Sequence, residues 1–194
     1  MITVLLVLQS CYTTKINTIE DISNRELEIP LRLNSFTIID DRDSISTDFD
    51  LHIPFFTSYN HHKRKYIPPH NSNHKAIIAN ITERVFNGNV GTASVVDVII
   101  TIKEGGVEKY SHSGTLISEW ATVEMKTEIV GMTGKVSSTM TVTEAINNMW
   151  NGPGAKKDMK SRVDELYVLT LKNATYRSLE YIKEYMIEEG VIKK

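Results

Sequence analysis

The sequence predicts an α+β fold: an antiparallel sheet of about four to five strands with two helices packed on one face. Three observations predict it. Runs rich in Val, Ile and Thr indicate strands. Two other segments carry apolar residues three and four positions apart, which indicates amphipathic helices. Three of the predicted strands follow one another directly along the chain, and this favours an antiparallel meander because sequential strands are usually neighbours.

The first half of the chain is predicted to contain one clear strand and one helix. The strand covers residues 31–41 and ends in a polar cluster, Asp40 to Asp43. A long connection without a sustained period follows over residues 43–71, with a short strand expected at 51–56. Asn or Ser at 71–73 supplies an N-cap for the helix, and Asn87-Gly88 closes it.

The second half is predicted to contain three strands and a long helix. The strands cover residues 93–103, 115–130 and 135–146, with turns predicted at 104–106 and 131–134. From residue 156 onward one helix is favoured, although the run 166–171 taken alone also fits a strand. The helix face expected to lie toward the core contains Val163, Leu166, Tyr167, Thr170, Ala174, Ser178, Tyr181, Ile182 and Tyr185.

The composition is that of one ordinary globular domain. The chain has 194 residues, of which 41% are hydrophobic and 24% charged, and a formal net charge of −2. This charge provides no basic field for nucleic acid, so no nucleic-acid partner is expected. A single cysteine excludes a disulfide framework within one chain and a thiolate zinc site. We expect no cofactor.

The N-terminus carries the most informative motif, because the only cysteine, Cys11, ends an apolar run. Leu8-Gln9-Ser10-Cys11 resembles a bacterial lipobox, in which the cysteine is acylated and the chain is cut ahead of it. Ten residues span only about 15 Å as a helix, half a bilayer core. The motif predicts a signal segment (1–10), a solvated tether (11–30) and a single periplasmic domain (31–190). The alternative is a buried N-terminal strand with an inert core cysteine.

The order of elements resembles the small YajG-type lipoproteins of the bacterial outer membrane. The resemblance rests on the leader ending at Cys11, on the strand that closes in Ile38-Ile39-Asp40-Asp41-Arg42, and on the following helix, meander and final amphipathic helix. It covers most of residues 31–188 and implies a non-enzymatic, envelope-attached protein. Asp40 and Arg42 are the residues carried over. As alternate residues of an extended segment they point to one side, where a strand-end ion pair or a binding role is expected.

Histidines supply the strongest candidate for metal or ligand chemistry. His61, His62, His70 and His74 lie within fourteen residues, and imidazole is a common zinc and copper ligand. Lys63 to Lys65 would repel a cation, and no Asp or Glu lies between residues 51 and 82 to complete a hydrolytic site. A solvated basic loop that contacts headgroups, acidic polysaccharide or a partner is the alternative.

These observations lead to one expectation and one alternative. We expect a lipoprotein held in the outer membrane through Cys11, with its domain in the periplasm and a non-catalytic accessory or scaffold role toward another envelope protein. Gly-x-Ser-x-Gly is absent and the sole thiol lies in the leader, so no enzymatic activity is expected. The residue after Cys11 is not Asp, which favours the outer membrane. The alternative is a ligand- or metal-binding module that uses the histidine-rich loop 52–74.

Overall fold

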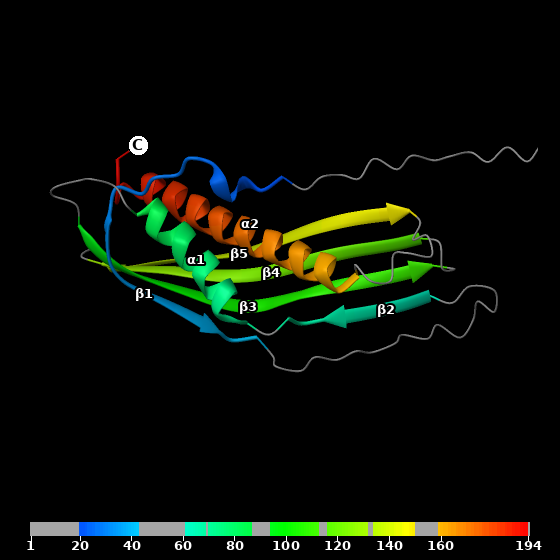
Figure 1. Ribbon diagram of the computed structural model, residues 1–194. Helices are drawn as coiled ribbons and strands as arrows, with labels where there is room; N and C mark the ends of the chain where they lie inside the picture. Colours follow the sequence, from blue (N-terminus) through cyan, green and yellow to red (C-terminus); the bar gives the residue numbers. More distant parts are fainter. Residues whose placement is uncertain are drawn as a thin grey trace, which may run out of the picture.

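A five-stranded mixed sheet forms one layer of the protein and two helices form the other (Figure 1). The computed structural model describes residues 20–42, 61–68, 70–86, 94–112, 116–131, 134–149 and 159–193. The elements, in chain order, are η1 (Ile22–Asn24), β1 (Arg32–Asp40), β2 (His61–Tyr66), α1 (Ser72–Val85), β3 (Val95–His112), β4 (Leu116–Gly131), β5 (Gly134–Met149) and α2 (Met159–Glu188). The predicted α+β class, with two helices packed against the sheet, is confirmed.

The strand order is β1-β3-β4-β5, and β2 also pairs with β3. β1 runs parallel to the first half of β3, from Arg32 opposite Val95 to Asp40 opposite Ile102. β2 runs antiparallel to the second half. The expectation of a wholly antiparallel sheet is therefore wrong for β1. The chain passes through α1 before it enters β3, and a crossover of this kind brings strands together in parallel.

Two local predictions about the strands are also wrong. Residues 61–66, predicted to lie in a loop, form β2, while the strand expected at 51–56 lies outside the described residues. Gly105-Gly106 is not a turn, because β3 continues through it as far as His112 after an irregularity between Ile102 and Glu104. These glycines lie in the middle of a paired strand, opposite Thr122 and Val123 of β4. β4 ends at Gly131 and β5 begins at Gly134, which pair with each other, while residues 132–133 of the predicted turn lie outside the described residues.

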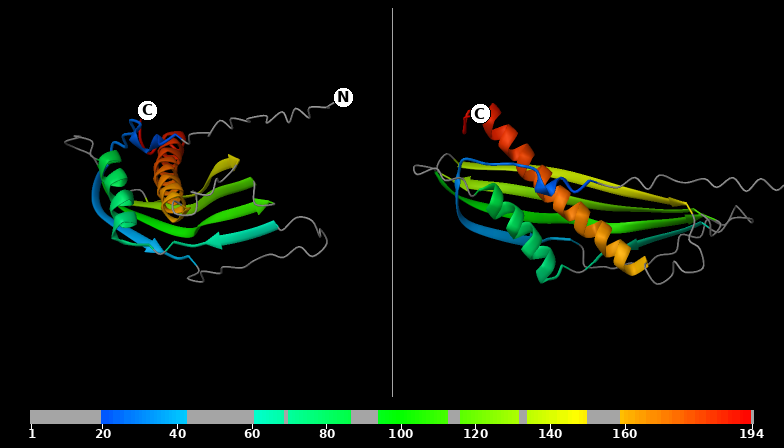
Figure 2. Two further views of the ribbon diagram at one scale, coloured as in Figure 1. Left: turned by 45° about the vertical axis from the view of Figure 1, so that its right-hand side comes forward. Right: turned by 45° about the horizontal axis from the view of Figure 1, so that its top comes forward.

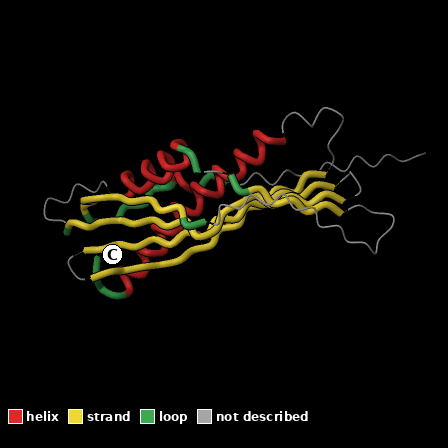
Figure 3. Tube along the Cα trace, turned by 90° about the horizontal axis from the view of Figure 1, so that it is seen from below, coloured by secondary structure: helices red, strands yellow, loops and turns green. Residues whose placement is uncertain are grey.

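The core lies between the sheet and the helices, which Figure 3 shows as separate layers. Alternate residues of the central strands face the helices, as the pleat requires. Fully buried side chains in this layer come from both central strands and both helices: Val98, Ile100, Ile102, Val123, Met125, Ile78, Tyr167, Leu171, Leu179 and Ile182.

α1 begins where the sequence predicts, and α2 is one long helix, as the sequence also predicts. Asn71 caps α1, and its side chain accepts the backbone N–H of His74 at 3.0 Å. α2 is a single helix of 30 residues, so the alternative of a strand at 166–171 is wrong. Tyr181 and Tyr185, predicted to face the core, are 47% and 41% exposed. In this part of α2 the buried side chains are Ile182, as predicted, together with Leu179 and Met186.

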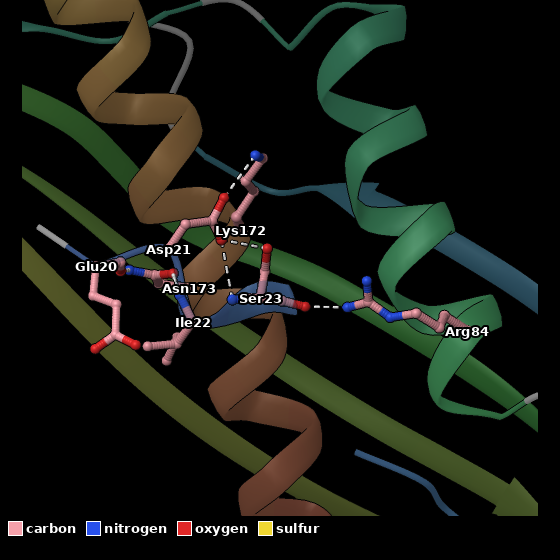
Figure 4. Close-up of polar contacts among 7 residues, drawn as sticks. All are labelled: Glu20, Asp21, Ile22, Ser23, Arg84, Lys172 and Asn173. Carbon is pink, nitrogen blue, oxygen red and sulfur yellow. Dashed lines mark hydrogen bonds and ion pairs between the residues drawn. The ribbon is translucent and has the colours of Figure 1, made fainter. Parts of the chain in front are cut away.

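The segment before β1 is part of the folded domain, although residues 11–30 were predicted to be a tether. Ile22 is buried, and its N–H donates to Asn173 Oδ1 of α2 at 3.1 Å. Asn173 Nδ2 in turn donates to the Glu20 carbonyl at 3.0 Å, and Lys172 Nζ pairs with Asp21 Oδ2 at 2.9 Å (Figure 4). The prediction is therefore wrong for residues 20–30, while residues 11–19 lie outside the described part of the chain.

The same segment also joins the two helices. The Arg84 guanidinium of α1 donates to the Ser23 carbonyl (Figure 4). Further along, the Ile29 N–H donates to the Val85 carbonyl at 2.9 Å, and Ile29 is fully buried. Residues 20–30 thus cross over α2 and end against the last turn of α1. Among the helices of the described residues, none is long and apolar enough to cross a membrane.

Candidate functional site

The predicted pair Asp40 and Arg42 forms an ion pair at the end of β1. Arg42 Nε lies 2.7 Å from Asp40 Oδ1, and Nη2 lies 2.9 Å from Oδ2, so the contact is bidentate. The Arg42 side chain is only 5% exposed, against 32% for Asp40. Hydrogen bonds from the guanidinium lower the pKa of the Asp40 carboxyl. Arg42 is therefore a nearly buried cation that Asp40 holds in place.

Tyr167 of α2 joins this pair to the start of α1. Arg42 Nη1 donates to Tyr167 Oη at 3.1 Å, and His70 Nε2 lies 3.1 Å from the same oxygen. A guanidinium can only donate, so the hydroxyl accepts from Arg42 and is free to donate its own proton to a neutral His70 Nε2. Burial raises the pKa of the Tyr167 hydroxyl to about 12, which keeps it protonated and able to donate.

His70 and His74 complete the cluster, with their rings in edge-to-face contact. Their centroids lie 5.2 Å apart, and the His74 ring lies 5.4 Å from that of Tyr167. Burial, followed by the nearby charge of Arg42, lowers the pKa of His70 to about 4 and also lowers that of His74. Both imidazoles are thus neutral at pH 7. Their Nδ1 atoms are buried without a hydrogen-bond partner.

Gly105 of β3 makes room for this cluster. A Cβ atom at this position would lie 2.9 Å from Tyr167 Oη and 3.2 Å from Arg42 Cδ. Both distances are shorter than ordinary van der Waals contact, so any larger residue would displace the tyrosine or the arginine. The glycine that was predicted to mark a turn instead allows α2 to approach the sheet closely at this point.

The structure brings together four of the residues singled out from the sequence and separates two others. Asp40, Arg42, His70 and His74 meet around Tyr167. His61 and His62 lie on β2 opposite His112 and Ser111, at the end of that strand remote from α1. Cys11 lies outside the described residues.

Sequence reasoning missed the role of Tyr167 and of Gly105 in this cluster. Tyr167 was predicted to be core, which is correct for its ring, but no local pattern shows that its hydroxyl meets residues 97 and 125 positions away. The available signal for Gly105 was its position beside a β-branched segment, where glycine within a strand suggests close approach of another backbone or side chain.

The cluster is suited to fixing elements in place rather than to holding a cation. Arg42 lies close enough to lower the pKa of both histidines, and the same positive charge opposes a metal ion. No group of three or more histidine, cysteine or acidic side chains with the geometry of a metal site occurs within the described ranges. The Arg42, Tyr167 and His70 side chains instead connect β1, α2 and the residues preceding α1 through hydrogen bonds.

Comparison with known proteins identifies no family for this chain. No family model matches it, and no curated protein matches its sequence. Among solved structures, a minor lipoprotein from Acinetobacter baumannii aligns over 80% of this chain and 95% of its own, with 11% identity and a TM-score of 0.43. A likeness at this level carries neither fold nor function to the present chain. Membership of the YajG-type family therefore stays a prediction.

Proposed function

We propose that this chain is a lipoprotein of the bacterial cell envelope, anchored in the outer membrane by acyl chains on Cys11, with its α+β domain in the periplasm. Its role there is that of a non-catalytic accessory or scaffold that binds another envelope protein. The observation that carries the proposal is Leu8-Gln9-Ser10-Cys11 at the end of an apolar run. Each buried acyl methylene contributes about 0.8 kcal/mol, so several chains on one cysteine hold a domain firmly.

The position of the folded domain is compatible with such an anchor. The first described residue, Glu20, lies nine positions after Cys11, and the domain is already packed from Ile22 onward. At no more than about 3.6 Å per residue, this connection reaches roughly 30 Å. The domain of an acylated chain would therefore stay within about 30 Å of the bilayer surface, a distance suited to contact with other membrane-bound proteins.

Metabolic labelling with an alkyne analogue of palmitate, in a bacterial host, tests the anchor. The native chain is expected to incorporate label, and Cys11→Ala is expected to lose it. Ser10→Ala is the matched control, because it keeps a small residue before the cysteine and should be labelled normally. Equal labelling of the native chain and Cys11→Ala contradicts the anchor.

Crosslinking in intact cells, followed by purification from detergent-solubilised membranes, tests the scaffold role separately. The acylated chain is expected to carry a discrete crosslinked envelope protein, and the unanchored Cys11→Ala chain is expected to lose most of it. Recovery of the chain without a second protein contradicts the role even if the anchor is present.

The alternative of a metal-binding loop has less support from the geometry. Only two of its four histidines meet, and the charge of Arg42 opposes a cation beside them. Titration calorimetry with zinc and copper ions tests it, and micromolar binding that disappears in His70→Ala would revive it.

A further inference from the structure

The outer edge of β5 has the properties of an interaction surface. Among the described residues β5 pairs with β4 alone, and it does so over sixteen residues without a register shift. Residues 136–143, Val-Ser-Ser-Thr-Met-Thr-Val-Thr, contain no charge and no proline. Natural edge strands are normally protected from pairing by lysine, proline, bulges or short length. This stretch of β5 has none of these protections.

The opposite edge of the sheet shows the contrast. β1 has nine residues against sixteen for β5, and its pairing with β3 is interrupted between Leu33 and Ser35. It also ends in the charged pair Asp40 and Arg42. β1 and β5 thus differ in length, regularity and charge, and of these two strands only β5 is suited to receiving another strand.

The helix layer leaves an apolar flank open above the same edge. α1 covers the side of α2 that faces β1, and residues 20–30 cover the side that faces away from the sheet, as the left view of Figure 2 shows. α2 packs on both β4 and β5, and among the described elements no further helix lies beside it above β5. Tyr181 and Tyr185 are 47% and 41% exposed although their neighbours Leu179 and Ile182 are fully buried. Tyr181 lies nine positions, or about two and a half helical turns, after Lys172, which contacts Asp21. We therefore infer that Tyr181, with Tyr185 one turn further, lies on the side of α2 that residues 20–30 leave uncovered.

We propose that this surface, the β5 edge with Tyr181 and Tyr185, binds a second copy of the chain. The two β5 strands pair antiparallel about a twofold axis at Thr139, which joins the two sheets into one. In antiparallel pairs, opposite residues lie on the same face. An axis at Thr139 therefore places Val136 opposite Val142 and Ser137 opposite Thr141. Lys135 lies opposite Thr143, so no two like charges meet along the seam.

The spacing of the helices fits this arrangement. Ser178 Oγ of α2 contacts Thr127 Oγ1 of β4 at 2.5 Å, and Thr127 pairs with Ser138 of β5, next to the axis. α2 therefore lies over β4 at the level of the axis. The two β4 strands would be three strand spacings apart, about 14 Å. Directly packed helices lie about 8–10 Å apart, so large side chains are needed to fill the remaining space. The two exposed tyrosines of each copy are placed to do so.

Placing two like charges opposite each other at the twofold axis tests the proposal. The experiment uses the full chain with Cys11 kept reduced. Thr139→Lys places two lysines directly opposite each other and is expected to weaken the dimer at least about fivefold in sedimentation equilibrium. Thr37→Lys is the matched control, because it places the same exposed substitution on the other edge strand, β1. Its dimer should match that of the native chain.

Mixing two variants separates loss of pairing from loss of folding. Thr139→Glu alone should weaken the dimer as Thr139→Lys does, and an equimolar mixture of the two should restore association to at least the native level. A native chain that stays monomeric at about 100 µM overturns the proposal. Failure of the mixture to associate, or equal weakening by Thr37→Lys, also overturns it. The anchor proposed on Cys11 is untouched by each of these outcomes.

Discussion

Tyr167 is the residue at which β1, α2 and the start of α1 are connected by polar contacts. Its hydroxyl accepts a hydrogen bond from Arg42 and is positioned to donate one to His70, both at 3.1 Å. Its ring is fully buried. A single buried oxygen thus gives one hydrogen-bond partner to Arg42 Nη1 and one to His70 Nε2.

Tyr167→Phe removes this oxygen and keeps the ring. Arg42 Nη1 and His70 Nε2 then lose a partner inside the protein, which we expect to lower the free energy of unfolding by about 1–3 kcal/mol. Urea denaturation followed by circular dichroism measures the change. Tyr181→Phe is the matched control, because its tyrosine is 47% exposed on the same helix, and it should change stability by less than about 0.5 kcal/mol. Equal effects would show that the buried contacts contribute little.

The low pKa of His70 predicts a dependence of stability on pH. Burial lowers this pKa from 6.5 to about 4, so between these values the unfolded chain binds a proton that the folded chain does not. The contribution is fully present above pH 6.5 and is lost as the pH falls toward 4, by up to about 2 kcal/mol after allowance for partial solvent screening. The pKa of Asp40 is lowered from 3.8, so its contribution is lost only below that window.

Denaturation curves at several pH values between 4 and 7 measure this dependence. His70→Gln, which cannot titrate, should show a flatter profile than the native chain across the same range. An unchanged slope in His70→Gln would assign the acid sensitivity to other groups, among them His74, whose pKa is also lowered.

At the scale of elements, the packing of α2 on the sheet depends on Gly105. Gly105→Ala places a Cβ atom 2.9 Å from Tyr167 Oη, and we expect a loss of about 1–3 kcal/mol in unfolding free energy. In a Tyr167→Phe background the atom responsible for the closest contact is absent, so the same substitution should cost less. A double-mutant cycle by urea denaturation measures the difference. If the two substitutions have purely additive effects, Gly105 is needed for the backbone conformation of β3 and not for the contact between Tyr167 and the sheet.

The sequence predicted those elements whose signal is local and missed those that depend on distant partners. The N-cap Asn71, the helix from 72 to 85 and the hairpin between β4 and β5 all follow from nearby residues, and the structure confirms them. The space that Gly105 leaves is filled by Tyr167, 62 positions later, and the parallel pairing of β1 depends on a crossover through α1. Neither of these two features produces a periodic pattern of residues in the sequence.

The candidate site was predicted in the same partial way. Asp40 and Arg42 are two positions apart, so the ion pair expected at the end of the strand needs no distant partner, although Arg42 itself lies two residues beyond β1. His70 and His74 were selected because histidines are concentrated there, and the same argument selected His61 and His62, which the structure places at the far end of β2. Residue type alone could not separate the two pairs, because tertiary packing decides which imidazoles are buried.

For the whole molecule, the boundary of the domain is the feature on which sequence and structure differ most. Residues 20–30 were predicted to be solvated because they contain Glu20, Asp21, Glu26 and Glu28. The structure shows that the apolar residues between these charges decide the outcome. Ile22 and Ile29 are 5% and 0% exposed, and Asp21 pairs with Lys172. Residues 20–30 are therefore part of the fold, because two of their apolar side chains are buried although the segment is mostly polar.

A chain that begins at residue 20 and one that begins at residue 31 should differ in stability for this reason. The shorter chain loses the burial of Ile22 and Ile29, each worth about 2 kcal/mol, so its unfolding free energy should be lower by about 4 kcal/mol. Thermal and urea denaturation of the two chains measure the difference. Ile29→Ala in the longer chain should reproduce at least about 2 kcal/mol of it, whereas Glu28→Ala, at an exposed neighbouring position, should not. Equal stabilities of the two chains would mean that residues 20–30 act as part of the tether. The connection between Cys11 and the domain would then be twenty residues long and not nine, and the domain could lie about twice as far from the bilayer.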